Sequence, residues 1–128
     1  AKIVNNFQIL SIAQITAEAL TLAQKLDLNL NVFKEVNAGT TANNGQFHIN
    51  FMSKVLKNDV EPGFTIDLAH KDMGLAIETG NNFRVGLPVG SSVHAVYSQA
   101  RSSEYSKKDF SALLDYACEL AGIKPPRI

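Results

Sequence analysis

Near its N-terminus the sequence reads Ile3-Val-Asn-Asn-Phe-Gln-Ile-Leu-Ser-Ile-Ala-Gln-Ile-Thr-Ala-Glu-Ala-Leu-Thr-Leu-Ala-Gln-Lys-Leu26, without a glycine or a proline. The apolar residues recur at helical spacing but cover more than one stripe, which predicts a single helix buried on several sides. Such a helix would be roughly 35 Å long, about twice the length of an ordinary globular helix. A helix of this length normally crosses between domains or subunits, so we expect it to organise the fold.

Start and stop signals for helices divide the rest of the chain. Asn29 and Thr65 are placed as N-caps, Pro88 stands where a helix-opening proline belongs, and Ser106 with Asp109 resembles a capping box. Glycines follow three of the expected ends. The further helices are expected at 30–37, 47–56, 66–79, 88–100 and 107–121, and the fold class is therefore all-α with five or six helices.

The segment 47–56 allows two interpretations. Phe47, Phe51 and Val55 lie on one face of a helix, whereas Phe47, Ile49 and Phe51 would lie on one face of a strand. Met52 and Leu56 also follow the helical spacing, and we favour the helix.

Length and composition exclude several classes of protein. The chain has 128 residues with 45% hydrophobic content, which is enough for one core but not for two. Twelve basic residues balance twelve acidic ones, so we expect no nucleic acid partner and no attraction to an anionic membrane. The single cysteine, Cys118, rules out an internal disulfide and favours a reducing compartment, either an organelle matrix or the cytoplasm, and we expect a cytoplasmic location. The apolar stretch 3–26 carries too many polar residues for a helix that faces lipid.

Metal and thiol chemistry are not expected. The three histidines, His48, His70 and His94, do not pair at metal-ligand spacing, so we expect no metal site. Cys118 lies on the apolar stripe of the last expected helix, where a small buried side chain is the default. No glycine-rich dinucleotide-binding motif is present either.

Two pairs of polar residues could carry chemistry. Lys2 and Asn6 are one helical turn apart, so their side chains can converge on one small group. A lysine can exchange a proton with an oxygen to which a neighbouring amide is hydrogen-bonded. Lys71 and Asp72 could form the edge of an anion or cofactor site, although adjacent charges are usually a solvated pair.

Three motifs in fixed order resemble the β-hydroxyacid dehydrogenases, the relatives of 3-hydroxyisobutyrate dehydrogenase. The resemblance runs along essentially the whole chain. The motifs are Lys2-Ile-Val-Asn5-Asn6 opening the long helix, Phe64-Thr-Ile-Asp-Leu-Ala-His-Lys71-Asp72-Met-Gly-Leu-Ala, and Leu87-Pro88 with Tyr97 and Asp109-Phe110-Ser111-Ala112.

The resemblance implies a fold and a function. Residues 1–128 would form a helical domain like the C-terminal domain of 6-phosphogluconate dehydrogenase, with a long first helix, serving substrate binding and dimerisation. A Rossmann domain that binds most of an NAD or NADP molecule would precede Ala1 and is absent from this chain. The whole enzyme would interconvert a short, anionic 3-hydroxy acid and its semialdehyde as a homodimer or larger homo-oligomer, and the isolated domain would be inactive.

The resemblance also implies site roles. In the family, a lysine acts as general acid and base, and an asparagine binds the reacting oxygen. By position, the catalytic residues would be Lys2 and Asn6, the substrate-binding residues Asn5 and Phe64, and the cofactor-binding residues Lys71 and Asp72. In some members a serine follows the asparagine pair by three residues, where this chain has Ile9.

One alternative belongs to a different class of function. The chain could be a helical dimerisation or interaction module without a catalytic role, in which Lys2 and Lys71 are surface charges. A glycine-rich dinucleotide-binding motif upstream of Ala1 would favour the enzyme, and its absence would favour the module.

Overall fold

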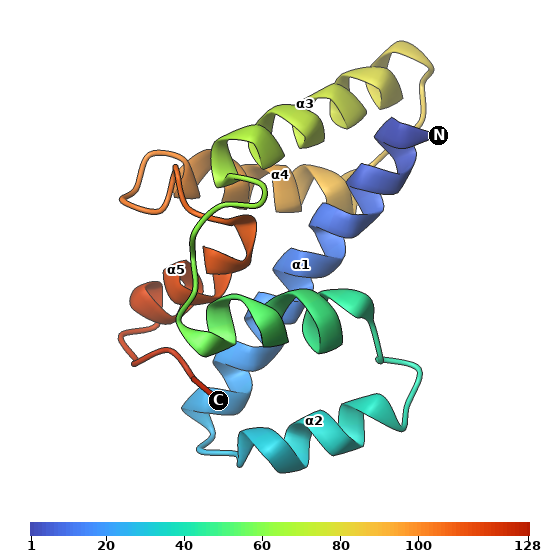
Figure 1. Ribbon diagram of the computed structural model, residues 1–128. Helices are drawn as coiled ribbons and strands as arrows, with labels where there is room; N and C mark the ends of the chain where they lie inside the picture. The colour runs from blue at the N-terminus through green and yellow to red at the C-terminus, as the bar shows by residue number, and fades with distance from the viewer.

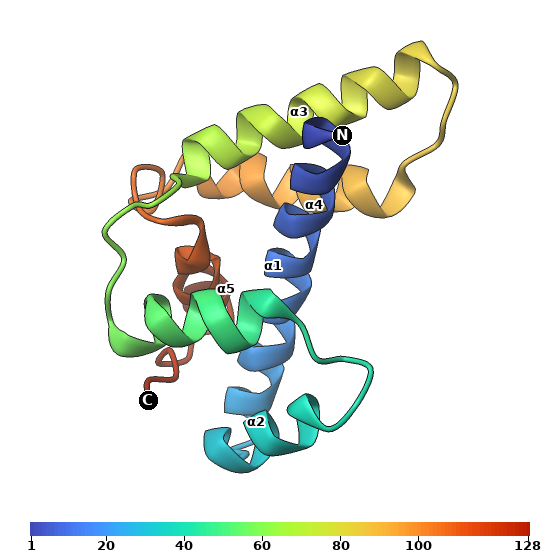
Figure 2. The ribbon, with the colours of Figure 1, turned by 45° about the vertical axis from the view of Figure 1, so that its right-hand side comes forward.

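A single long helix forms the spine of the molecule. The computed structural model describes residues 1–128, and its helix α1 spans Lys2–Lys25. Helices α3 (Ile66–Asn82) and α4 (Pro88–Ala100) lie beside the N-terminal half of α1, and α2 (Leu30–Ala38) lies beyond the other half, as Figures 1 and 2 show. The predicted long helix is confirmed.

The remaining elements are short helices, and no strand forms beyond an isolated bridge between Thr65 and Asp109. The all-α fold class is confirmed. The caps at Asn29 and Thr65 are also confirmed, because both side chains accept hydrogen bonds from backbone N–H groups of the helices they precede. The short elements are a π-helix at Gln46–Phe51, 3₁₀-helices at Val55–Lys57 and Phe110–Ala112, and α5 at Leu113–Leu120.

The core surrounds α1 on more than one side, as its apolar pattern predicted. Leu10, Ala13, Ala17 and Leu20 of α1 are almost completely buried. The hydroxyl of Tyr97 donates a hydrogen bond of 2.9 Å to the carbonyl of Leu10 and joins α4 to α1 inside this core. Partners from the other elements include Phe47, Phe51, Ile66, Met73, Leu113 and Leu114.

Helix α3 is longer than predicted, because Gly80 does not end it. A Cβ atom on Gly80 would lie 2.8 Å from Leu87 Cδ1 and 2.9 Å from the carbonyl oxygen of Val85. The glycine therefore allows the following loop to pack against the helix. The chain leaves the helix only at Phe83 and Arg84, where Arg84 adopts a positive φ of 58°.

The predicted start of the last helix at Ser106 is wrong. The carbonyl of Ser106 accepts the N–H of Asp67, which binds this segment to the first turn of α3. The cap is Asp109, whose carboxylate accepts the N–H and the hydroxyl of Ser111. The helix consequently begins with a 3₁₀ turn at Phe110.

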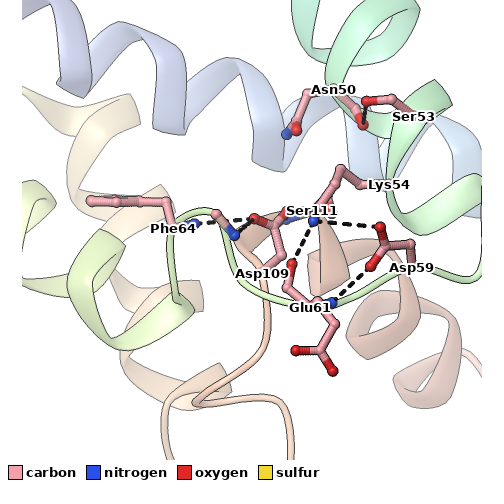
Figure 3. A network of polar contacts seen from close by, with 9 residues as sticks. Asn50, Ser53, Lys54, Asp59, Glu61, Phe64, Asp109 and Ser111 are labelled. Carbon is pink, nitrogen blue, oxygen red and sulfur yellow. Dashed lines mark hydrogen bonds and ion pairs between the residues drawn. The ribbon is translucent and has the colours of Figure 1, made fainter.

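The segment 47–56 is helical, as we favoured, but it is divided. A π-helix places Phe47 and Phe51 in the core, and a 3₁₀ turn buries Val55. Between them, Lys54 donates to the carbonyl of Glu61 and pairs with Asp59, as Figure 3 shows. These contacts turn the chain toward the loop that leads to α3.

Candidate functional site

The N-terminal end of α1 and the middle of α3 form a small cavity. Its volume is about 210 Å³, and its charged and polar walls come from both helices. Lys2 and Asn6 face it from α1 because they are one turn apart, and Lys71 and Asp72 face it from α3. The lining residues are Lys2, Ile3, Asn6, Lys71, Asp72 and Leu75.

One hydrogen bond connects the two predicted pairs. The side-chain amide of Asn6 donates through Nδ2 to Oδ2 of Asp72 across 3.0 Å. Both side chains are half-buried, whereas Lys2 and Lys71 are exposed and form no ion pair within the chain. The cavity therefore combines two unpaired cations with an amide and a carboxylate that bind each other.

A second cavity adjoins the first at Asn6. It has a volume of about 160 Å³ and, apart from the amide, is apolar. Asn6 lines both cavities and separates the charged one from the apolar one. The walls of the second cavity are Asn6, Ile9, Leu10, Phe64 and Phe110.

A buried carboxylate anchors Phe64 beside this apolar cavity. Oδ1 of Asp109 accepts the N–H groups of Gly63 and Phe64 at 3.1 and 3.2 Å, as Figure 3 shows. The carbonyl of Phe64 accepts the N–H of Phe110 at 2.8 Å, and the two rings meet edge to face at 6.0 Å. We did not predict this anchoring role for Asp109, which the sequence marked only as a partner of Ser106 in the expected capping box and as part of the third motif.

Asn5 lies apart from the other predicted site residues. Its side chain is exposed and lines neither cavity, because consecutive residues of a helix point about 100° apart. The structure thus brings together Lys2, Asn6, Lys71 and Asp72, and places Phe64 next to them.

Two of the three histidines pack at the interface of α3 and α4. The rings of His70 and His94 stack at 4.6 Å, and Arg101 donates to Nδ1 of His70. Burial, with help from the charge of Arg101, holds the pKa of His70 below its ordinary value. No group of three or more histidine, cysteine or acidic side chains is arranged to hold a metal ion.

Cys118 is fully buried on α5, as its place on the apolar stripe predicted. Burial raises the pKa of its thiol, which opposes nucleophilic reactivity.

None of the helices is long and apolar enough to cross a lipid bilayer.

Comparison with known proteins shows relatives along nearly the whole chain. The 3-sulfolactaldehyde reductase of Escherichia coli is 38% identical over 122 residues, which cover 95% of this chain and 41% of that protein. The 2-(hydroxymethyl)glutarate dehydrogenase of Eubacterium barkeri is 28% identical over 95% of this chain and 40% of its own length. The chain thus spans about two fifths of these relatives.

Solved structures agree with the fold. The 3-hydroxyisobutyrate dehydrogenase of Salmonella typhimurium superposes with a TM-score of 0.82 at 29% identity, over 90% of this chain and 40% of that one. The Mycobacterium tuberculosis 3-hydroxyisobutyrate dehydrogenase, solved with L-serine, gives 0.80 at 32% identity, over 91% of this chain and 42% of that one. A family model described as "NAD-binding of NADP-dependent 3-hydroxyisobutyrate dehydrogenase" matches residues 1–117, and the chain belongs to that family.

Proposed function

We propose that this chain is the C-terminal part of an NAD(P)-dependent oxidoreductase that interconverts a short 3-hydroxy acid and its semialdehyde. The observation that supports the proposal most strongly is the shared cavity of Lys2, Asn6 and Lys71. Members of the same family are named as dehydrogenases and reductases of small acids and aldehydes. Since the chain spans only two fifths of those relatives, we expect the isolated domain to be inactive.

The residues of the cavity suit an anionic substrate and cofactor. Two ammonium groups without an ion-pair partner can bind a carboxylate or a phosphate, and Lys71 is the group that we assign to the cofactor.

Reduction of an aldehyde needs a hydride at carbon and a proton at oxygen. A bound nicotinamide supplies or accepts the hydride. We assign the proton to Lys2, which donates it from Nζ during reduction and takes it back during oxidation. Asn6 has a second N–H on Nδ2 that can bind the same oxygen while the first is bonded to Asp72. Phe64 gives the neighbouring cavity an apolar wall.

Replacing Lys2 tests this assignment in the full-length protein that contains this chain. Lys2→Ala should lower kcat by about 10²- to 10⁴-fold, the usual contribution of general acid–base catalysis, while the Kd of the cofactor changes little. Lys57→Ala removes an exposed lysine outside both cavities and should leave kcat unchanged. Small semialdehydes that bear a carboxylate or a sulfonate, assayed with NADH and NADPH, would identify the substrate.

The same experiment separates the enzyme from a non-catalytic interaction module. A module predicts no turnover in the full-length protein with any of these substrates. Turnover that survives in Lys2→Ala would instead support the enzyme hypothesis and refute the role of the lysine.

We also propose that the domain assembles with a second copy through the outer face of α1. A groove of about 780 Å³ runs between α1, α4 and α5, and its lining is mostly apolar. Ile15, Leu22 and Leu120 line it with 60, 60 and 68% of their surfaces exposed. An apolar surface of this extent on a neutral protein favours a homodimer.

Light scattering on the purified protein tests the assembly. A dimer should be measured for the wild type, and Leu22→Glu should shift it toward monomer, because a charge in the groove would be desolvated. Leu28→Glu, an exposed leucine outside the groove, should leave the dimer intact. A wild-type monomer would refute the interface.

A further inference from the structure

We propose that Asp72 is a positioning residue that sets the orientation of the Asn6 amide, a role that rests on the oxidoreductase function proposed above. The two residues come from different helices and are separated by 66 positions in the chain. Their hydrogen bond is the polar contact that joins α1 to α3 at the site. Asp72 would then act on the reaction through Asn6, and this role replaces the cofactor contact that the family resemblance implied for Asp72.

The chemistry of the two side chains determines which way the amide faces. An asparagine amide has a donor end and an acceptor end of nearly equal size, so shape alone does not select its orientation. An ionised carboxylate can only accept hydrogen bonds. With Asp72 opposite it, Asn6 must present Nδ2, and the reverse orientation would place two oxygen atoms against each other.

This orientation matters for the reaction assigned to the site. The carbonyl oxygen of an aldehyde is an acceptor, and it gains negative charge as the hydride arrives. Asn6 can stabilise that oxygen only through an N–H group, and Nδ2 keeps one N–H after the other is given to Asp72. An amide that could flip would spend part of its time with Oδ1 toward the substrate, which repels the developing charge.

The place of Asn6 makes a fixed orientation possible. The side chain is half-buried and lines both cavities, so the hydrogen bond holds it at the boundary between them. A displacement of about 1 Å in such a group can reduce a rate about 100-fold. A carboxylate that stops this motion therefore contributes to turnover without contacting a reactant.

Two substitutions of Asp72 separate positioning from a direct effect of charge. Asp72→Asn keeps an oxygen that can accept from Asn6 but removes the charge, whereas Asp72→Ala removes both. Positioning predicts that Asp72→Ala lowers kcat about 10- to 100-fold and that Asp72→Asn recovers most of the loss. A direct electrostatic role at the cofactor predicts equal losses in both variants and a changed Kd for the cofactor.

A double-mutant cycle in the full-length protein tests whether Asp72 acts through Asn6. Asn6→Ala should lower kcat at least as much as Asp72→Ala, and the double variant should lose no more than Asn6→Ala alone. Asp67→Ala removes another carboxylate of α3, outside the cavity, and should leave kcat unchanged. Losses that multiply in the double variant would overturn the proposal.

The orientation of the amide can also be observed without turnover. In a ¹⁵N spectrum of the full-length protein, one Nδ2 proton of Asn6 should be shifted and protected from exchange by its hydrogen bond. The shift and the protection should disappear in Asp72→Ala, persist in Asp72→Asn and persist in Asp67→Ala. Resonances of Asn6 that do not respond to Asp72→Ala would refute the positioning role.

The outcomes distinguish a failure of the positioning role from a failure of the proposed function. If Lys2→Ala retains its turnover, the assigned chemistry is wrong, whatever the spectrum of Asn6 shows. If Lys2→Ala is inactive but Asp72→Ala has the kcat of the wild type, the chemistry stands and the positioning role is refuted.

Discussion

The ring of Phe7 lies against Gly90 where α1 and α4 cross. A Cβ atom on residue 90 would lie 2.3 Å from Cε2 and 2.5 Å from Cζ of Phe7, closer than atoms can pack. The absence of a side chain at Gly90 thus lets the two helices approach at this crossing. Phe7 follows Asn6 directly, so the crossing also supports the end of α1 that carries the candidate site.

Gly90→Ala should therefore destabilise the domain. The added methyl group must displace the ring of Phe7, and overpacking of this kind costs about 1–3 kcal/mol of the free energy of unfolding. Urea denaturation measures the change. Gly86→Ala is the matched control, because a Cβ there would contact nothing within 4 Å and should change stability by less than about 0.5 kcal/mol. Equal stabilities of the two variants would contradict close packing at Gly90.

Replacing Asp109 should destabilise the domain, because its carboxylate binds both the loop before α3 and the 3₁₀ turn at Phe110. Asp109→Ala leaves the N–H groups of Gly63, Phe64 and Ser111 without their partner, and an unsatisfied buried group costs about 1–3 kcal/mol. The free energy of unfolding should fall by at least about 2 kcal/mol, as measured by urea denaturation. Asp59→Ala removes a more exposed carboxylate of the same region and should have a much smaller effect. A similar loss in both variants would contradict the anchoring role.

Local signals explain which helices could be predicted from the sequence. The lack of glycine and proline before Asp27 correctly predicted α1, and Pro88 correctly predicted the beginning of α4. Both signals depend only on residues of the helix itself. Gly80 and Ser106 misled the prediction because their roles are set by packing and hydrogen bonds with residues outside their own helices. Gly80 packs against the loop that follows α3, and Ser106 bonds to the first turn of α3.

The candidate site, too, could be predicted from local signals only in part. The spacing of Lys2 and Asn6 indicated that they share a face, since both belong to one helix. Their meeting with Lys71 and Asp72 depends on how α1 packs against α3, which no local pattern encodes, and only the family resemblance pointed to it. The hydrogen bond between Asn6 and Asp72 and the anchoring of Phe64 by Asp109 were not predicted, because each joins residues at least 45 positions apart.

Cys118 should react with thiol reagents only after unfolding. The side chain is buried, its pKa is raised by burial, and its sulfur lies 3.5 Å from the hydroxyl of Thr21. The chain has one cysteine, so the absorbance released from a disulfide reagent reports this position alone. The control is the rate of labelling in about 6 M urea, which is strongly denaturing for a domain of this size. Labelling in native buffer that is as fast as in urea would contradict the burial.

His70 joins α3 to α4 as a neutral side chain. Arg101 can only donate, so Nδ1 of His70 must accept at 3.0 Å, and Nε2–H donates to the hydroxyl of Ser98 at 2.8 Å. Burial lowers the pKa of His70 most, the charges of Arg101 and His94 lower it further, and Asp67 opposes them. The unfolded chain, in which the pKa returns to about 6.5, therefore binds this proton more readily than the folded protein.

The sign of the resulting pH dependence follows from that difference. The contribution of His70 to the free energy of unfolding should be fully present above pH 7, and it should be lost as the pH falls below about 6.5 toward the lowered pKa of the folded state. Thermal unfolding followed at intervals between pH 8 and pH 5 should show Tm falling over the acidic half of that range. His70→Gln cannot be protonated and should flatten this part of the profile, whereas His48→Gln, at a ring that contacts Asn37 of α2, should keep it. A profile that is the same in His70→Gln and the wild type would show that the stack of His70 on His94 does not couple protons to folding.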